Sequence, residues 1–114
     1  MKERAMIIDL NNETTYLDDG TYTATIQNVF DFLKGDDPCI CIEFAIEDED
    51  NTVFTKFYDD PAKWLGSYPW SSLFRAIGSR DTNDLIGLHV EFEVKTNTKN
   101  DLSFSNIKKI KLVD

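Results

Sequence analysis

The sequence predicts a single, mainly β domain with one helical connection, and three observations support this prediction. The chain has 114 residues, which is about one domain's worth. Five segments alternate apolar and polar residues with the period of two that is typical of strands. One segment, between the third and fourth of these, instead repeats its apolar residues with helical spacing. Hydrophobic residues make up 41% of the chain and aromatic residues 12%, which is enough apolar bulk to fold despite 29% charged residues.

The first three predicted strands lie in the amino-terminal half. Residues 21–29 follow the turn signal Asp18-Asp19-Gly20 and alternate threonines with apolar residues. Residues 39–47 place one set on the predicted core side, namely Ile40, Ile42, Phe44 and Ile46. Residues 52–58 return after an acidic tip at residues 47–51, which is typical of a solvated hairpin turn.

Helical periodicity begins after Pro61, a residue that suits the first turn of a helix. An apolar stripe follows at spacings i, i+3, i+4 and i+7, formed by Trp70, Leu73, Phe74 and Ile77. Gly78 stands at the position of a carboxy-terminal cap. Two more strands are predicted at residues 85–95 and 102–113, with a phase shift near Asn106.

Three strands, a helical connection and two strands match the order of a small Greek-key barrel of the oligonucleotide/oligosaccharide-binding (OB) type. We therefore predict a five-stranded OB-like barrel over residues 20–114. Residues 1–19 are an amino-terminal extension or an extra strand. The alternative is an α+β sandwich, because strand order cannot be read from alternation alone.

The charge and the apolar patterning exclude several classes of protein. The formal net charge is −9, which argues against binding nucleic acid or an anionic membrane through net charge alone. Residues 1–60 hold 4 basic and 15 acidic residues, whereas residues 61–114 hold 8 and 6. No stretch approaches the roughly 20 apolar residues of a membrane span, and the first ten residues do not resemble a secretory signal. We expect a cytoplasmic location, no membrane partner, and two free thiols at Cys39 and Cys41.

Catalytic and metal-binding patterns are not found in the sequence. His89 is the only histidine and lies in a predicted strand with Glu91 and Glu93 on the same face, so we expect a solvated or salt-bridged side chain. Cys39, Cys41 and His89 are too few for a structural zinc site. No glycine-rich phosphate loop is present. The chain is therefore predicted not to be an enzyme and to use no metal or other cofactor.

A candidate binding surface lies on the third strand. If Val53, Thr55 and Phe57 face the core, the outward face presents Phe54, Lys56 and Tyr58, on a strand that OB barrels use for ligands. Aromatic rings stack on the bases of single-stranded nucleic acid, and lysines neutralise its phosphates. The loops expected to close over a bound strand supply four more candidates, namely Phe32, Lys34, Lys95 and Lys99.

Each candidate also has a structural interpretation. Phe54 and Tyr58 could pack beneath the helix, and Phe32 could cover the mouth of the barrel. Lysines near the carboxyl end of the chain, including Lys95 and Lys99, could instead protect an edge strand from aggregation.

Three short segments carry a resemblance to a known group of proteins. Residues 20–26 (Gly-Thr-Tyr-Thr-Ala-Thr-Ile), the Leu85-Ile-Gly87 start of a strand and the closing Phe104-Ser-Asn-Ile107 resemble small OB-fold single-stranded-DNA-binding-like proteins of phages, prophages and conjugative elements of low-GC bacteria. Many such proteins end in an acidic tail that recruits partners, whereas this chain ends Lys108-Lys-Ile-Lys-Leu-Val-Asp114. The resemblance implies a non-enzymatic module that binds single-stranded DNA or RNA in the replication or recombination of a mobile element. The alternative function is an acidic interaction or assembly module that binds a basic partner protein or another copy of itself.

Overall fold

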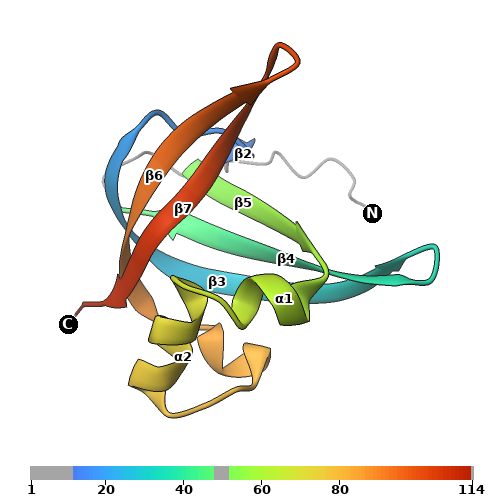
Figure 1. Ribbon diagram of the computed structural model, residues 1–114. Helices are drawn as coiled ribbons and strands as arrows, with labels where there is room; N and C mark the ends of the chain where they lie inside the picture. Colours follow the sequence, from blue (N-terminus) through green and yellow to red (C-terminus); the bar gives the residue numbers. More distant parts are fainter. Residues whose placement is uncertain (1–11, 48–51, 114) are drawn as a thin grey trace, which may run out of the picture.

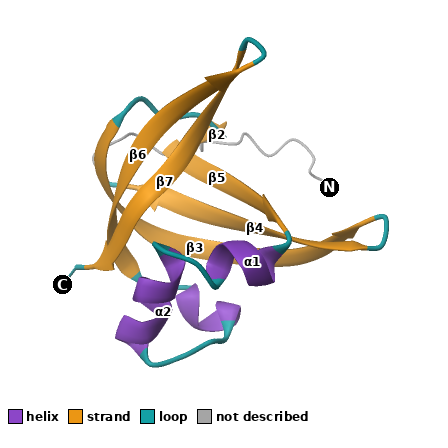
Figure 2. Cartoon of the chain, in the orientation of Figure 1, coloured by secondary structure: helices purple, strands orange, loops and turns teal. Residues whose placement is uncertain are grey.

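The computed structural model describes residues 12–47 and 52–113 and has the predicted mainly β architecture (Figures 1 and 2). The elements follow one another in this order: β2 (Asn12–Thr14), β3 (Gly20–Lys34), β4 (Asp37–Ile46), β5 (Thr52–Asp59), α1 (Pro61–Leu65), α2 (Trp70–Ile77), the 3-10 helix η1 (Thr82–Leu85), β6 (His89–Lys99) and β7 (Leu102–Leu112). The strands form one curled sheet, and the helices gather at one end of it.

The strand order β2-β5-β4-β3-β6-β7 decides between the two predicted folds. The five long strands pair antiparallel in the order β5-β4-β3-β6-β7, and the helical connection joins β5 to β6. This is the strand order of an OB-like barrel, so the predicted OB-like fold is confirmed and the α+β sandwich is not adopted. The short strand β2 is the addition, and it pairs parallel with β5.

The barrel is closed between β5 and β7 by side chains. The Lys56 ammonium on β5 donates a hydrogen bond to the Ser105 carbonyl on β7 at 2.9 Å. The buried Ser105 hydroxyl accepts from the Leu17 amide at 2.8 Å and donates to the Leu17 carbonyl at 3.0 Å. These bonds fasten the segment between β2 and β3 to β7, and Leu17 itself lies in the core.

The core is built around aromatic rings that come from four different elements. Phe44 on β4 contacts Phe92 on β6 and Phe54 on β5, with ring centroids 4.8 and 5.8 Å apart. Helix α2 closes one end of the barrel with Trp70, Leu73 and Phe74, which are all buried. The burial of these three residues confirms the predicted apolar stripe. The predicted Gly78 cap is also confirmed, because Gly78 adopts a left-handed φ of 70°.

Two strand predictions need correction. The fourth long strand begins at His89 rather than at residue 85, because residues 82–85 form η1, where the Asp81 side chain accepts a hydrogen bond from the Asn83 amide. The connection between the predicted strands 21–29 and 39–47, expected to be a loop, is mostly strand, since β3 and β4 remain paired out to Lys34 and Asp37. The β3–β4 and β6–β7 hairpins therefore project from the barrel as two long arms (Figure 1).

Other predictions are confirmed. Cys39 and Cys41 are free thiols. His89 Nε2 lies 2.9 Å from Glu47 Oε2 as a surface pair. The rest of the acidic tip, residues 48–51, lies outside the described residues.

Candidate nucleic-acid interface

The orientation of β5 differs from the one on which the binding surface was predicted. Phe54 is fully buried and Tyr58 is buried, whereas Phe57 is 55% exposed. The face with Phe54, Lys56 and Tyr58 therefore points into the barrel, and the expected outward row is wrong. Phe54 stacks on Phe92 with ring centroids 5.9 Å apart, so it cannot stack on a nucleic-acid base.

The buried side of β5 nevertheless leads into a groove beyond the aromatic core. Its volume is about 440 Å³, and it lies between β5, the α1–α2 segment and β7. The lining residues come from these elements and from β6: Lys56, Tyr58, Trp64, Tyr68, Pro69, Trp70, Asn97, Asn106, Ile107 and Lys108. We call this region the aromatic groove.

One wall of the aromatic groove is a run of three rings. Tyr58 lies between Trp70 and Trp64, with ring centroids 6.1 and 6.0 Å away. The Trp70 indole N–H donates to the Tyr58 hydroxyl at 2.8 Å, which fixes the buried end of the run. Burial raises the pKa of Tyr58 to about 12, so the hydroxyl stays protonated at neutral pH.

The other end of the ring run is open to solvent. Trp64 is 45% exposed and Tyr68 is 66% exposed. The short helix α1 begins at Pro61 directly after β5, and this places Trp64 beside Tyr58. The groove therefore offers accessible ring faces that continue a buried aromatic wall.

Three lysines accompany these rings. The Lys63 ammonium lies 5.5 Å from the centre of the Trp64 ring, and the Lys56 ammonium lies 5.3 Å from the centre of the Tyr58 ring. Lys56 is held by its bond to the Ser105 carbonyl, and burial lowers its pKa. The Lys56 side chain therefore serves mainly to close the barrel, and it is less suited to binding a phosphate at the surface.

Lys108 reaches the groove because of an irregularity in β7. Glu93 pairs with Lys109 and Val94 pairs with Ile107, so Lys108 is the extra residue of a β-bulge. The bulge places two adjacent exposed lysines between the buried Ile107 and Ile110: Lys108 lines the groove, and Lys109 pairs with Glu93. The phase shift predicted near Asn106 is found two residues later.

The remaining predicted site residues are divided between other surfaces. Phe32 and Lys34 are exposed on β3, and Phe32 contacts Phe57 with ring centroids 6.4 Å apart. Lys95 and Lys99 are exposed on β6, and the Lys95 ammonium lies 3.8 Å from an Asp19 carboxylate oxygen. Of the seven predicted residues, only Lys56 and Tyr58 line the aromatic groove.

Sequence reasoning missed the contributions of Trp64, Tyr68 and Lys108 to one site. Their positions in a helical connection and on a lysine-rich strand gave no common periodicity. The sequence did contain a signal for an aromatic site, because Trp64 lies at the end of the first short helical segment and Tyr68 and Trp70 follow within six residues. Only the folded barrel brings this segment against β7.

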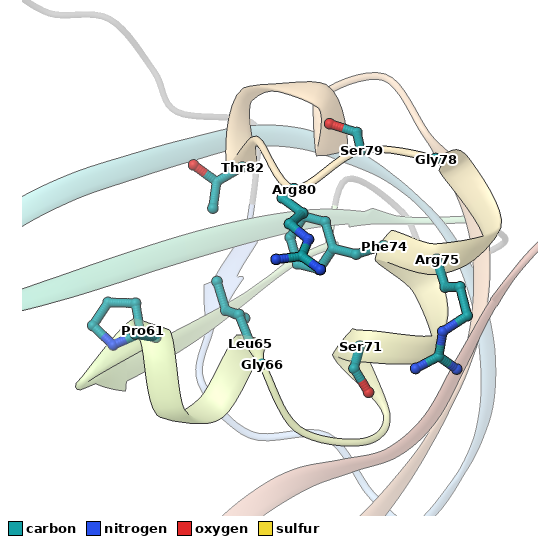
Figure 3. A pocket seen from close by; sticks show the side chains of 11 residues that line it. Pro61, Leu65, Gly66, Ser71, Phe74, Arg75, Gly78, Ser79, Arg80 and Thr82 are labelled. Carbon is teal, nitrogen blue, oxygen red and sulfur yellow. The ribbon is translucent and has the colours of Figure 1, made fainter.

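A larger hollow of about 720 Å³ lies between α1, α2 and the segment leading to η1 (Figure 3). Its ring, Phe74, is buried, and the guanidinium groups of Arg75 and Arg80 do not converge in this view. The Ser79 hydroxyl already donates to Asp84. This hollow offers neither an accessible ring face nor a focused set of polar groups.

No protein-family model and no curated protein matches the sequence. Within residues 12–47 and 52–113, no three His, Cys, Asp or Glu residues are grouped so that they could hold a metal ion. In the same part of the chain, no helix has the length and apolar character needed to cross a membrane.

Proposed function

We propose that this protein is a non-enzymatic module that binds single-stranded DNA or RNA along the aromatic groove, without strong sequence preference. The OB-like strand order supports the class of ligand, because barrels of this type bind oligonucleotides with the help of projecting loops. The β3–β4 and β6–β7 arms correspond to those loops.

The observation that carries the proposal is the composition of the groove in an acidic protein. The formal net charge is −9, yet none of the described residues that line the groove is Asp or Glu. Lys56 and Lys108 line it, and Lys63 lies over Trp64. A polyanion can therefore approach this region without facing a carboxylate in the groove itself.

The arrangement suits the contacts that sequence-independent binding needs. Trp64 and Tyr68 present ring faces on which bases can stack, and each stacked base is worth about 1–3 kcal/mol. Lys63 and Lys108 neutralise neighbouring phosphates. The Asn97 and Asn106 side chains line the same groove and supply amide groups for hydrogen bonds to bases or sugars.

The resemblance of residues 20–26, 85–87 and 104–107 to single-stranded-DNA-binding-like proteins of phages and conjugative elements supports a wider role. We place the protein among modules that hold single strands during replication or recombination of a mobile element.

Titration of labelled oligo(dT) by fluorescence anisotropy tests the proposal, at about 50 and 200 mM salt. Trp64→Ala should weaken binding by about five- to 150-fold, the equivalent of one stacked base at 1–3 kcal/mol. Tyr68→Ala should also weaken binding. Tyr16→Ala is the matched control, since Tyr16 is exposed but does not line the groove.

Two results would contradict the proposal. Absence of binding at the lower salt concentration would remove the nucleic-acid function. Binding that Trp64→Ala and Tyr68→Ala leave unchanged would show that the aromatic groove is not the site.

A further inference from the structure

A second surface of the molecule is aromatic, and it lies on the outer side of β3, β4 and β5. The strand register places Phe30, Cys41 and Phe57 in one row and Phe32, Cys39 and Asp59 in the next. Side chains at these positions point away from the core residues Ile40, Ile42 and Tyr58, which alternate with them. We call this surface the Phe face.

The rings of the Phe face are accessible, although the groups between them are not. Phe30 is 44% exposed and Phe32 is 41% exposed, in addition to Phe57. The edge of one ring meets the face of another at the Phe32–Phe57 contact, with an interplanar angle of 86°. Cys39 and Cys41 fill the space between the rings and are buried. Three large rings therefore share one apolar surface, and none of the helices in residues 12–47 and 52–113 covers this side of the sheet (Figure 1).

Carboxylates surround this apolar surface. Asp59 lies in the row of Phe32, and Glu43 lies in the next row, opposite Asn28 and Thr55. Burial raises the pKa of Cys41 to about 11, and the charges of Glu43 and Glu13 add to the effect. The thiol at the centre of the face thus senses two negative charges.

The cations near the face do not balance these charges. Among the described residues that the pairing of β3, β4 and β5 places on this side, Lys34 is the one cation, and it lies at the end of the hairpin opposite Asp37. The ion pairs of the described residues are His89–Glu47, Lys95–Asp19 and Lys111–Glu91, so none involves Glu13, Glu43 or Asp59. The face combines exposed rings with negative charges that have no ion-pair partner in that part of the chain.

From this combination we infer that the Phe face is a docking surface for a basic protein segment, one whose apolar side chains pack on Phe30, Phe32 and Phe57 while its Lys or Arg residues meet Glu43 and Asp59. Aromatic residues at the centre of an interface supply most of the binding energy. Complementary charges at its rim raise the association rate and select the partner.

The same charges argue against two other occupants. Nucleic-acid phosphates would face Glu13, Glu43 and Asp59, and the repulsion would oppose binding. A second copy related by two-fold symmetry would bring the same patch against itself, so its carboxylates would meet like charges. A basic segment satisfies both the rings and the carboxylates.

A labelled synthetic peptide of alternating leucine and lysine provides the probe. Fluorescence anisotropy at low salt should show binding, and added salt should weaken it. Two control peptides carry glutamate in place of lysine, or serine in place of leucine, and neither should bind comparably.

Variants of the protein locate the site. Phe57→Ala should weaken peptide binding at least about tenfold, as for a central interface residue. Phe104→Ala is the matched control, since Phe104 is similarly exposed but lies on β7. Glu43→Gln should weaken binding and reduce its salt dependence, whereas Asp101→Asn, in the other hairpin, should leave both unchanged.

Several outcomes would overturn the inference. One is peptide binding that Phe57→Ala and Phe30→Ala leave unchanged, and another is equal binding of the glutamate peptide. Loss of oligo(dT) binding in Phe57→Ala would instead assign the face to nucleic acid. Loss of self-association in the same variant, measured by light scattering, would assign it to a second copy. Oligo(dT) binding in the groove is a separate measurement, so absence of peptide binding alone leaves the proposed function unaffected.

Discussion

The aromatic groove and the Phe face lie on opposite sides of the same strand and have opposite electrostatic character. Strand β5 sends Lys56 and Tyr58 to the groove, and it sends Phe57 and Asp59 to the face. Both surfaces present rings, but lysines accompany the rings of the groove and carboxylates surround those of the face. Net charge therefore says little about either surface, because the period of two along a strand separates residues that are adjacent in sequence.

The first and largest test of this division compares two phenylalanines of β5. Phe54→Ala should lower the free energy of unfolding by about 3–5 kcal/mol, because it leaves a cavity between Phe44 and Phe92. Phe57→Ala should cost less than about 1 kcal/mol, since the ring is half exposed. Urea unfolding measures both. Similar losses for the two variants would contradict the orientation of β5.

Tyr58→Phe tests the anchoring of the ring run. It removes the acceptor of the buried Trp70 N–H and should cost about 1–3 kcal/mol. The pKa of Tyr58 is raised from 10 to about 12, so its contribution is complete below pH 10 and is lost as the pH rises towards 12. The variant should therefore show a smaller loss of stability over that range in urea unfolding. Tyr68→Phe, at an exposed position, is the control and should leave both quantities unchanged.

The bulge in β7 gives a test that involves two adjacent lysines. Lys108→Gln should weaken oligo(dT) binding and reduce the slope of log affinity against log salt by about 0.7–1, as expected for one phosphate contact. Lys109→Gln makes the same change in charge, but Lys109 pairs with Glu93 and does not line the groove. Equal effects from the two variants would rule out a specific role for Lys108.

The charge of the Phe face can be measured at its central thiol. In a Cys39→Ala background, Glu43→Gln should lower the pKa of Cys41 from about 11 towards its ordinary value, by a fraction of a unit. Burial, the main cause of the raised pKa, remains in the variant. Thiolate absorbance against pH gives the value. An unchanged pKa would mean that the Glu43 carboxylate does not act on the face.

The smallest effect is expected when both probes are present. Because the two surfaces share no lining residue, oligo(dT) affinity should change by no more than about twofold when the leucine–lysine peptide is saturating, which corresponds to about 0.3–0.5 kcal/mol. Anisotropy of the labelled oligonucleotide, with unlabelled peptide added, measures this. Strong competition would mean that the probes share one surface. The lysine of the peptide also binds DNA directly, so the peptide–oligonucleotide mixture without protein is the control.

Much of the fold could be predicted from local patterns. Ile40, Ile42 and Phe44 alternate with less apolar neighbours, and all three are buried as predicted. The Trp70–Ile77 stripe and Gly78 define α2 by spacing and by a cap that requires positive φ. In these segments one face is clearly more apolar than the other, so the pattern has one solution.

The orientation of β5 could not be predicted because both of its faces carry large or apolar residues. Val53, Thr55 and Phe57 alternate with Phe54, Lys56 and Tyr58, and burial extends to Val53 and Thr55 as well as to Phe54. The alternation of residues along the strand therefore does not indicate which of the two faces of β5 is buried. The position of Lys56 adds to the ambiguity, because a lysine among core residues is unusual unless its ammonium finds a partner, as it does at Ser105.

By itself, the sequence determined most of the strands, the plugging helix and their succession along the chain, since these depend on periodicity and caps within single segments. Only the tertiary structure decided which side of β5 points inward, which residues form the aromatic groove and which form the Phe face. That decision depends on contacts between segments far apart in the chain, above all the fit of Phe54 between Phe44 and Phe92 and the bond from Lys56 to β7. Such contacts leave no period in the sequence, because each joins residues from different strands once the sheet has curled.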